Sequence, residues 1–415
     1  MTIRLHKPQD SVSGKVCLPG SKSISNRVLM IKALSGSSFG LENLSDSDDT
    51  GNLLDALRAV QEDTSQVIDI GHAGTDMRFL TAYLATREGG AYELTGSERM
   101  QQRPIGELVH VLRSLGAAIS YKHKEGFPPL LIRGKRLQGG ITAIRGDISS
   151  QFVSALLLIA PYLEKGLQLE LTGNIVSRPY IDMTAETMKL FGAQVAETAQ
   201  MFQVRPLPYR QRTEAYTVES DWSAASYFYS MVALSKVGTT LTLGGLFENS
   251  LQADAACSAI YKGFGVETTF GNQAIVISKT SETSPGMMAY DFTDCPDIAQ
   301  TLVCTCAALQ TPFHFTGLQT LKVKETDRIL ALQQELEKMG VRLEATTHDL
   351  SYDGNTVLNR KPVQIATYHD HRMAMSFAPL ALVHDNLSIE QAGVVSKSYP
   401  RFWDDLRKIG FYTKP

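Results

Sequence analysis

The hydrophobic and polar positions of the chain follow a repeated pattern. Five times, an amphipathic, helix-like segment ends at a glycine and a strand-like run follows directly. The five glycines are Gly116, Gly192, Gly265, Gly340 and Gly410, which are separated by 76, 73, 75 and 70 residues. Glycine is a common left-handed terminator of a helix. A period near 75 is too long for a solenoid, so the pattern predicts small α/β modules.

A sixth module is expected before these five. Residues 53–60 have a helical pattern and residues 67–70 a strand-like one, with Gln61 near the place where the others have glycine. A chain of 415 residues exceeds the size of a single core, so we expect two domains of three modules each. Residues 204–212, with two prolines and three arginines, are the expected crossover.

The composition is that of a soluble globular protein, with 43% hydrophobic and 20% charged residues. A net charge of −3 gives no general attraction to nucleic acid or to an anionic membrane. An anionic ligand would therefore have to be bound by cations gathered locally. The longest apolar stretches, residues 155–163 and 377–383, are too short to span a bilayer, and residues 1–15 lack a secretory signal. We expect a cytoplasmic protein with no membrane or nucleic-acid partner.

Neither the cysteines nor the histidines indicate a metal. The five cysteines are odd in number and include no CxxC pair, which argues against a disulfide framework or a zinc ribbon. Cys304 and Cys306 alternate within an apolar stretch, which is typical of small core residues. In His369-Asp370-His371 the neighbouring side chains point in different directions, and no HExxH pattern supports a site. No metal is expected.

Three polar turns in the first part of the chain precede predicted helices. Lys22 and Ser23 stand at the start of a helix expected over residues 24–34, and Arg27 lies one turn further on. Helix starts favour phosphate and carboxylate groups, although an ordinary helix cap explains the same residues. Gly74 would allow close approach of a ligand, or simply form a tight turn. Arg103 precedes Pro104 at an expected first helical position, where an exposed arginine is the plain alternative.

Hydroxyl and amide side chains stand before two further helices. Ser149, Ser150 and Gln151 precede the apolar run of residues 153–160. Ser177 and Tyr180 flank another helix start, and all of these are good phosphate or hydroxyl ligands. Helix capping remains an equal alternative for the serines.

The titratable groups lie in the second half of the chain. Asp297 begins the apolar segment of residues 298–309, and five charges fall within residues 322–328, among them Lys324, Glu325 and Arg328. Surface salt bridges would explain the five charges of residues 322–328 if no other motif accompanied them. Arg372 and Lys397 stand at two further junctions before helices. Cations at comparable junctions of repeated modules predict an anion-binding cleft between two domains.

The ordered motifs resemble those of EPSP synthases, members of the enolpyruvyl transferase family. From residue 18 to residue 403 they are LPGSKSISNR, GHAGTDMR, RPI, SSQF, SRPYID, DWSAASYF, PD, KVKETDR, DHRMAM and KSYPRFW. The resemblance implies an inside-out α/β barrel-like fold of two domains, each of three repeated α/β modules around buried parallel helices. One domain would hold residues 1–20 and 220–415 and the other residues 21–219, with the active site in a cleft that closes on substrate.

The resemblance also implies the reaction. Phosphoenolpyruvate and shikimate 3-phosphate would give 5-enolpyruvylshikimate 3-phosphate and phosphate, in the shikimate pathway that leads to chorismate and the aromatic amino acids. The reaction would proceed by addition and elimination, without a cofactor, a metal or a covalent enzyme adduct. A monomer is expected.

Site residues carry over from the matching motifs. Shikimate 3-phosphate would be bound by Lys22, Ser23, Arg27, Ser149, Ser150, Gln151, Ser177, Tyr180, Asp297 and Lys324. Phosphoenolpyruvate would be bound by Lys22, Gly74, Arg103, Gln151, Arg328, Arg372 and Lys397. By the same resemblance, Asp297 would take the proton of the attacking 5-hydroxyl and Glu325 would exchange a proton with the methylene carbon. Lys22 would help phosphate to leave.

The sequence departs from the family pattern at four positions. His72 and Thr320 stand where asparagine is usual, Asp76 replaces a small or hydroxyl residue, and Phe79 replaces proline. Two alternatives stay open. One is the related transferase acting on UDP-N-acetylglucosamine, which typically has a reactive loop cysteine, although no cysteine lies between residues 18 and 256 here. The other is an inactive anion-binding protein of the same fold.

Overall fold

The chain folds into two compact units. The computed structural model describes residues 1–8, 11–356, 358–359 and 361–414. The discontinuous unit consists of Met1–Gly20 and Glu219–Pro415, and the continuous unit of Ser21–Val218. The second crossover therefore lies between residues 218 and 219, later than the predicted segment of residues 204–212. Within the discontinuous unit, Gly20 and Ser220 form an isolated antiparallel bridge beside the two crossovers.

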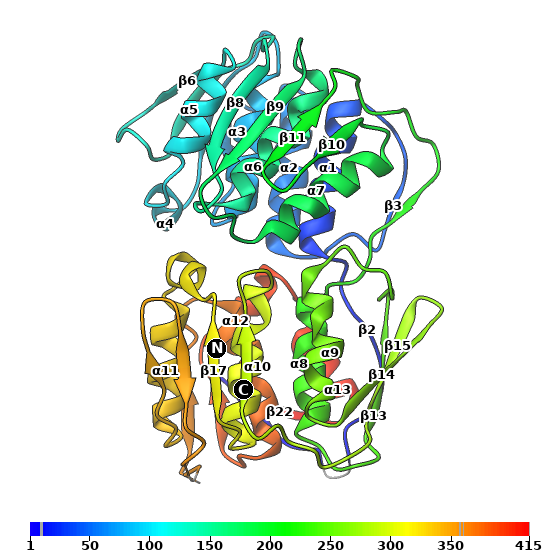
Figure 1. Cartoon of the computed structure of the whole chain (residues 1–415), viewed down its shortest axis with the longest axis vertical. Helices are drawn as coiled ribbons and strands as arrows, with labels where there is room; N and C mark the ends of the chain where they lie inside the picture. Colours follow the sequence, from blue (N-terminus) through cyan, green and yellow to red (C-terminus); the bar gives the residue numbers. More distant parts are fainter. Residues whose placement is uncertain (9–10, 357, 360, 415) are drawn as a thin grey trace. The chain divides into compact units, whose positions relative to one another are not determined.

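The discontinuous unit contains three four-stranded sheets and six α-helices among its described residues. Its strands are β1 (Ile3–His6), β2 (Ser13–Cys17), β13 (Thr240–Gly244), β14 (Val266–Gly271), β15 (Ala274–Lys279), β16 (Met288–Asp291), β17 (Phe313–Thr316), β18 (Glu344–Ala345), β19 (Leu350–Tyr352), β20 (Val363–Ile365), β21 (Leu387–Ile389) and β22 (Tyr412–Lys414). Its helices are α8 (Trp222–Ala233), α9 (Cys257–Lys262), α10 (Ala299–Ala308), α11 (Arg328–Lys338), α12 (His371–Phe377) and α13 (Phe402–Lys408) (Figure 1). Short 3-10 segments connect them: η2 (Ala253–Ala256), η3 (Pro296–Ile298), η4 (Gln319–Val323), η5 (Ala378–Leu382) and η6 (Ala392–Lys397).

The continuous unit contains two four-stranded sheets and one two-stranded sheet. Its strands are β3 (Leu41–Glu42), β4 (Val67–Asp69), β5 (Ala91–Thr95), β6 (Ala118–Tyr121), β7 (Leu130–Arg133), β8 (Gly140–Arg145), β9 (Leu167–Thr172), β10 (Val195–Glu197), β11 (Met201–Val204) and β12 (Tyr216–Thr217). Its helices are α1 (Lys22–Ser35), α2 (Asp48–Gln61), α3 (Gly74–Ala85), α4 (Glu98–Gln101), α5 (Gly106–Ser114), α6 (Ser150–Ile159) and α7 (Arg178–Leu190), with the 3-10 segment η1 (Ala160–Tyr162).

All five four-stranded sheets share one pattern of strand pairing. In each of them one parallel pair is followed by two antiparallel pairs. The orders are β4-β5-β7-β6, β8-β9-β11-β10, β2-β13-β15-β14, β16-β17-β19-β18 and β20-β21-β1-β22. The repeated α/β modules predicted from the sequence are therefore confirmed.

Five helix ends follow the predicted glycine pattern. The φ angles of Gly116, Gly192, Gly265, Gly340 and Gly410 are 105°, 88°, 70°, 89° and 102°. The strand that follows each glycine lies at the edge of its sheet. After Gly340 this strand is β18, which begins four residues later. The left-handed turn reverses the chain from the helix onto the sheet edge, as the sequence predicted.

The sixth module differs from its prediction. Its helix is present as α2, but β4 belongs to the next sheet and pairs in parallel with β5. The left-handed residue after α2 is Asp63, with φ 51°, two residues beyond Gln61, so the helix ends in a left-handed turn without a glycine. The sixth sheet consists only of β3 and β12, two strands that lie far apart in sequence.

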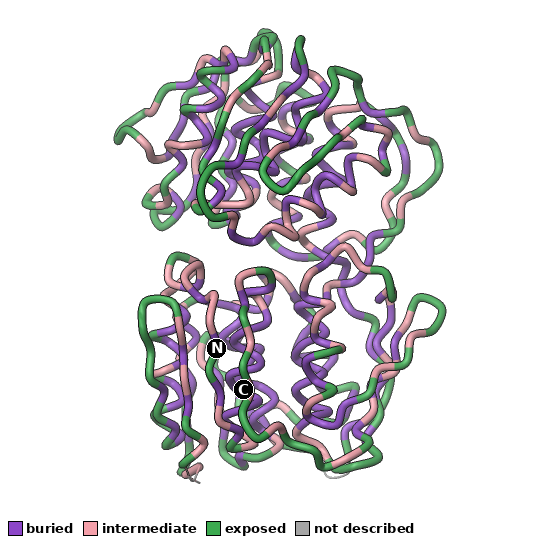
Figure 2. The backbone as a smooth tube through the Cα atoms, in the orientation of Figure 1, coloured by how far each residue is buried: buried purple, intermediate pink, exposed green. Residues whose placement is uncertain are grey.

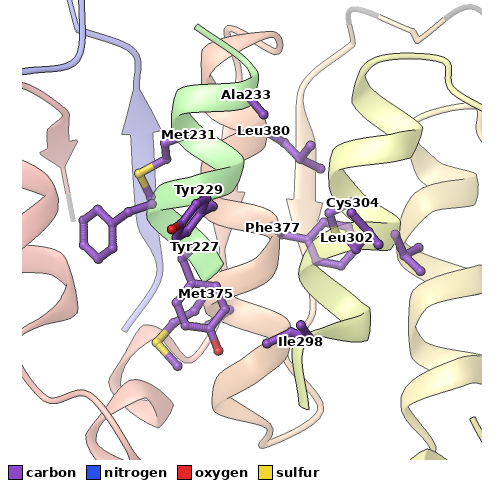
Figure 3. Close-up of a cluster of buried hydrophobic side chains, with 14 of the residues drawn as sticks. Tyr227, Tyr229, Met231, Ala233, Ile298, Leu302, Cys304, Met375, Phe377 and Leu380 are labelled. Atoms are coloured by element: carbon purple, nitrogen blue, oxygen red, sulfur yellow. The ribbon is translucent and has the colours of Figure 1, made fainter. Parts of the chain in front are cut away.

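Central helices form the core of each unit. Every residue of α8 and α12 is buried, as are most residues of α10, α3 and α6 (Figure 2). A helix that is apolar all round requires such a fully enclosed position. Tyr227 of α8, Leu302 of α10 and Phe377 of α12 lie in one hydrophobic cluster (Figure 3). Among the described residues, no helix is both long and apolar enough to cross a membrane.

The cysteines behave as the sequence predicted. Cys304 and Cys306 lie in α10 and have no exposed surface. Burial raises the pKa of both thiols. Cys17 is exposed, and all five cysteines are free thiols.

Replacement of Gly265 by alanine should destabilise the discontinuous unit strongly. A Cβ atom there would overlap the carbonyl oxygen of Ser281 and would require φ 70° of an alanine. Left-handed strain costs roughly 1–2 kcal/mol and overpacking roughly 1–3 kcal/mol more. Gly238→Ala is the matched control, because Gly238 also has positive φ but nothing lies within 4 Å of the position that its Cβ atom would take. Denaturant unfolding should show a clearly larger loss for Gly265→Ala; equal losses would contradict the steric explanation.

Candidate functional site

The predicted site residues of the discontinuous unit, called its half-site below, are Asp297, Lys324, Glu325, Arg328, Arg372 and Lys397. Arg328 is their central cation. Arg328 is the first residue of α11, whose start is fixed because the Asp327 carboxylate accepts the backbone N–H groups of Ile329 and Leu330. Its guanidinium bonds three carboxylates: Asp370 through Nε at 2.7 Å, Glu325 through Nη2 at 2.9 Å and Asp297 through Nη1 at 3.3 Å. Only 1% of the side chain is exposed. One buried arginine thus pairs with both carboxylates that the family resemblance indicates for proton transfer.

Three further cations surround these carboxylates. Arg372 Nη2 lies 3.0 Å from Asp297 Oδ2, and Lys324 Nζ lies 3.8 Å from Asp297 Oδ1. Lys397 Nζ lies 2.9 Å from Glu325 Oε1. The structure therefore brings together all six of the predicted site residues that belong to this unit.

Helix starts position several of these groups. Asp297 lies in η3 directly before α10, and Arg372 is the second residue of α12. The α12 cap is Asp370, whose Oδ1 accepts the backbone N–H of Arg372 at 2.8 Å. Lys397 ends η6 and precedes the last helix, α13, which begins at Phe402.

The charged groups of this half-site shift one another's pKa values. Burial acts to raise the pKa of Asp297, but Arg372, Lys324 and Arg328 together hold it well below its usual range. Burial lowers the pKa of Lys324, an effect that Asp297 opposes. Burial also acts against the charged form of Arg372, but Asp297 and other neighbours raise its pKa overall. Asp297 is therefore an ionised carboxylate at neutral pH, held among cations and able to accept a hydrogen bond.

Sequence reasoning missed several partners in this unit. Asp370 is fully buried and bonds Arg328, and Asp254 and Ser223 lie behind Arg372. Asp370 and Ser223 fall inside motifs that were recognised, so those motifs were the available signal. Asp254 lies in η2, where no pattern marked it.

In the continuous unit, Lys22 begins α1 and pairs with α2. Lys22 Nζ lies 2.9 Å from Asp49 Oδ2, a carboxylate that is almost fully buried. Asp49 is a second partner that the sequence did not reveal. Lys22 itself is partly exposed, so its ammonium group stands at the accessible end of α1.

Gly74, the first residue of α3, lies against Arg103. A side chain at Gly74 would overlap the Arg103 guanidinium, so only glycine allows this approach. Gln151 Nε2 donates to Thr75 Oγ1 at 3.1 Å, which joins the start of α6 to the start of α3. Pro104 is not the first helical residue as predicted, because α5 begins at Gly106.

Arg27 occupies a more enclosed position than its predicted role as a phosphate ligand suggests. It donates to Thr184 Oγ1 at 2.7 Å, to the Tyr180 carbonyl at 2.9 Å, to the Ser23 carbonyl at 2.7 Å and to Ser154 Oγ at 3.3 Å. Burial lowers its pKa to about 10. In this structure Arg27 ties α1 to α6 and α7, and so positions Ser23 and Tyr180.

The predicted hydroxyl ligands differ in how they are used. Ser149 caps α6, because its Oγ accepts the backbone N–H of Gln151 at 3.3 Å, so the capping alternative holds for it. Ser177 precedes α7 in the left-handed conformation, with φ 54°, and does not cap the helix with its side chain. Ser150 and Tyr180 are partly exposed at the starts of α6 and α7.

The four residues that depart from the family pattern lie in different surroundings. His72 is exposed. Asp76 is fully buried and accepts a hydrogen bond from Asn26 Nδ2 at 2.9 Å, which joins α3 to α1. Phe79 lies under the Arg27 guanidinium, 5.6 Å from it. Thr320 lies in η4, shortly before Lys324.

Modules of small sheets around central helices, with cations at or near the helix starts, define an α/β protein with a cluster of candidate site residues on each unit. A family model described as EPSP synthase (3-phosphoshikimate 1-carboxyvinyltransferase) matches residues 6–67 and 60–406. The chain belongs to the EPSP synthase family. The family, the fold class and the class of enzyme predicted from the sequence are confirmed, and the alternative of a UDP-N-acetylglucosamine transferase is not favoured.

Individual relatives agree with the family match. A 3-phosphoshikimate 1-carboxyvinyltransferase of Bacteroides fragilis is 50% identical over 405 residues, which cover 97% of each chain. One of Sulfurovum sp. is 37% identical over 429 residues, covering 98% of this chain and 99% of the relative. A solved EPSP synthase structure from Acinetobacter baumannii has a TM-score of 0.81 over 100% of both chains at 22% identity, and so supports the fold.

Gly74→Ala should displace Arg103, which the family motifs indicate as a ligand of phosphoenolpyruvate, and so weaken binding of that substrate. The added methyl group overlaps the guanidinium, so the arginine must move. We expect the KM for phosphoenolpyruvate to rise about tenfold, equivalent to one lost charged hydrogen bond. Gly51→Ala in α2 is the control, since nothing lies near an added carbon there. An unchanged KM in Gly74→Ala, measured by steady-state kinetics, would contradict this placement of Arg103.

Proposed function

We propose that this chain transfers the enolpyruvyl group of phosphoenolpyruvate to the 5-hydroxyl of shikimate 3-phosphate, the reaction of its family. The products are 5-enolpyruvylshikimate 3-phosphate and phosphate. The observation that carries the proposal is the buried Arg328, which bonds Asp297 and Glu325 and so holds two proton-transfer groups among four cations. Such a fixed arrangement of charge suits a reaction in which a cationic centre and a departing phosphate develop together.

Phosphoenolpyruvate is bound mainly by cations that lie at or near helix starts. From the discontinuous unit these are Arg328, Arg372 and Lys397 and from the continuous unit Lys22 and Arg103, with the uncharged Gly74 and Gln151 as further ligands. Arg328 and Arg372 each present a planar fork of donors, which matches carboxylate and phosphate groups. Their present carboxylate partners would exchange contacts with the substrate.

Shikimate 3-phosphate is bound mainly by the polar helix starts of the continuous unit. Its ligands are Lys22, Ser23, Arg27, Ser149, Ser150, Gln151, Ser177 and Tyr180, with Asp297 and Lys324 from the discontinuous unit. Exposed backbone N–H groups at such helix starts add to the attraction for its phosphate. We propose that residues of both units bind this one pair of anionic substrates.

Asp297 is the base for the 5-hydroxyl and Glu325 the group that protonates the methylene carbon. The cations that hold the pKa of Asp297 low would be partly neutralised by the bound phosphate and carboxylate groups. Its pKa then rises toward a range in which it accepts the hydroxyl proton. Glu325 exchanges its proton with the carbon, Lys22 stabilises the leaving phosphate, and a closed site excludes water.

Cellular location and oligomeric state follow the same proposal. Cytoplasmic location suits the five free thiols, four of which are buried. A monomer is expected because every candidate site residue comes from a single chain. Size-exclusion chromatography with light scattering tests the monomer.

Phosphate release is the direct test of the reaction. With phosphoenolpyruvate alone we expect no turnover, and with shikimate 3-phosphate added we expect stoichiometric phosphate and enolpyruvyl product. Turnover with UDP-N-acetylglucosamine in its place would favour the related transferase. Absence of release with every acceptor, from a folded protein, would favour an inactive anion-binding protein.

Asp297→Asn should nearly abolish turnover while substrate binding remains. The amide cannot take the hydroxyl proton, and loss of a general base typically costs about 100-fold to 10,000-fold in kcat. Asparagine keeps the size of the side chain, which alanine would not. The exposed Asp291, which accepts the backbone N–H of Thr293, provides the control Asp291→Asn, with activity near that of the unmodified enzyme. Normal kcat in Asp297→Asn would exclude this residue as the base.

A further inference from the structure

A buried carboxylate that the proposed mechanism does not use lies behind Arg372. Asp254 belongs to η2, and 4% of its surface is exposed. Its Oδ2 accepts a hydrogen bond from the hydroxyl of Ser223, the second residue of α8. A buried carboxylate is costly unless charge or hydrogen bonds compensate it, so its position needs an explanation.

Ser223 connects Asp254 to Arg372. The single hydroxyl proton of Ser223 is donated to Asp254, so its oxygen lone pairs remain free to accept. Arg372 Nη2 donates to that oxygen at 3.3 Å. The three side chains therefore form one directed chain from guanidinium to hydroxyl to carboxylate, in which a charged Asp254 strengthens the hold on Arg372.

The other contacts of the Arg372 guanidinium depend largely on Asp297. Nη2 lies 3.0 Å from Asp297 Oδ2, and Nη1 donates to the Asp297 carbonyl at 3.1 Å and to Tyr227 Oη at 3.4 Å. The first of these is the charged contact, and it weakens when Asp297 turns to the substrate hydroxyl and takes its proton. The hydrogen bond between Ser223 and Asp254 involves no atom of Asp297, so it is kept through that event.

We propose that Asp254, acting through Ser223, is a positioning residue that keeps Arg372 aimed at phosphoenolpyruvate while Asp297 is engaged in proton transfer. The proposal rests on the proposed function of Asp297 and Arg372. It assigns no contact between Asp254 and either substrate. The expected signature is therefore a change in the handling of phosphoenolpyruvate and not of shikimate 3-phosphate.

The ionisation of Asp254 offers a second, independent signature. Burial and the nearby charge of Asp297 raise the pKa of Asp254 to about 7, against the opposing effects of Arg372 and Ser223. The other titratable groups around it are Asp221 at the start of α8 and the thiols of Cys257 and Cys295. Burial raises the pKa of both thiols, so they stay neutral at this pH.

Three variants test the chain of contacts. Ser223→Ala breaks the link, Asp254→Asn keeps the shape but removes the charge, and Asp254→Ala removes both. In Ser223→Ala and Asp254→Ala we expect the KM for phosphoenolpyruvate to rise about tenfold, the effect of one lost hydrogen bond to a charged group. The dissociation constant of shikimate 3-phosphate, measured by calorimetry, should change less than about twofold.

Tyr229→Phe is the matched control. It removes a buried hydroxyl from the same helix α8, one that bonds Thr268 instead of Arg372. Its kinetics should equal those of the unmodified enzyme. If Asp254→Ala fails to fold, Ser223→Ala carries the same test with a smaller change.

The pH dependence separates positioning by charge from simple packing. In the unmodified enzyme Asp254 gains charge as the pH rises through about 7, while asparagine cannot. The KM of Asp254→Asn relative to the unmodified enzyme should therefore grow from about pH 6 to about pH 8. A ratio that stays constant over this range would overturn the role of the charge.

Failure of this inference is distinguishable from failure of the proposed function. If the unmodified enzyme turns over and Asp297→Asn does not, the proposed function stands whatever Asp254 does. An unchanged KM for phosphoenolpyruvate in a folded Ser223→Ala would then overturn the positioning role alone. Equal effects on both substrates would also overturn it, because a general structural defect would explain them.

Discussion

The half-site of the discontinuous unit depends on the burial of one guanidinium. Removing a charged group from water costs several kcal/mol unless opposite charges and hydrogen bonds compensate it. Arg328 meets this requirement with Asp370, Glu325 and Asp297, which come from three separate segments of the chain. Each segment is therefore constrained to present its carboxylate at one point. Because Asp370 also caps α12, the same constraint sets the position of Arg372.

The fold could be predicted from the sequence where its signals are local. A helix that ends at a glycine and continues into an edge strand is visible within about ten residues, and all five such junctions have the expected left-handed glycine. Strand pairing across long separations leaves no such signal. The third position in the sheet with β20, β21 and β22 is filled by β1, from the other end of the chain. The sixth sheet pairs β3 with β12, so its module could not be recognised from residues 53–70.

The candidate site shows the same division between local and distant information. Its cations, and the two carboxylates that the family resemblance indicates for proton transfer, lie in compact motifs near helix starts, where residue type and position together indicate anion binding. Their partners are single residues from other segments. Asp254 and Asp49 stand in stretches that no sequence pattern marks. Only the folded chain shows that Asp254 is connected to Arg372 through Ser223, and that Asp49 pairs directly with Lys22. Arg27 was recognised as important, but its internal hydrogen bonds to Thr184 and Tyr180 could not be read from its motif.

The two units contribute different chemistry. In the discontinuous unit each of the four cations of the half-site already pairs with a carboxylate of the same unit, so Asp297 and Glu325 are held in place before substrate arrives. The continuous unit instead offers hydroxyl groups at helix starts and the cations Lys22 and Arg103. Without an anionic substrate, these rigidly held carboxylates remain paired with their cations and are poor bases. In the proposed mechanism, bound phosphate and carboxylate groups compete for those cations, and this competition would couple substrate binding to the release of Asp297 for proton transfer.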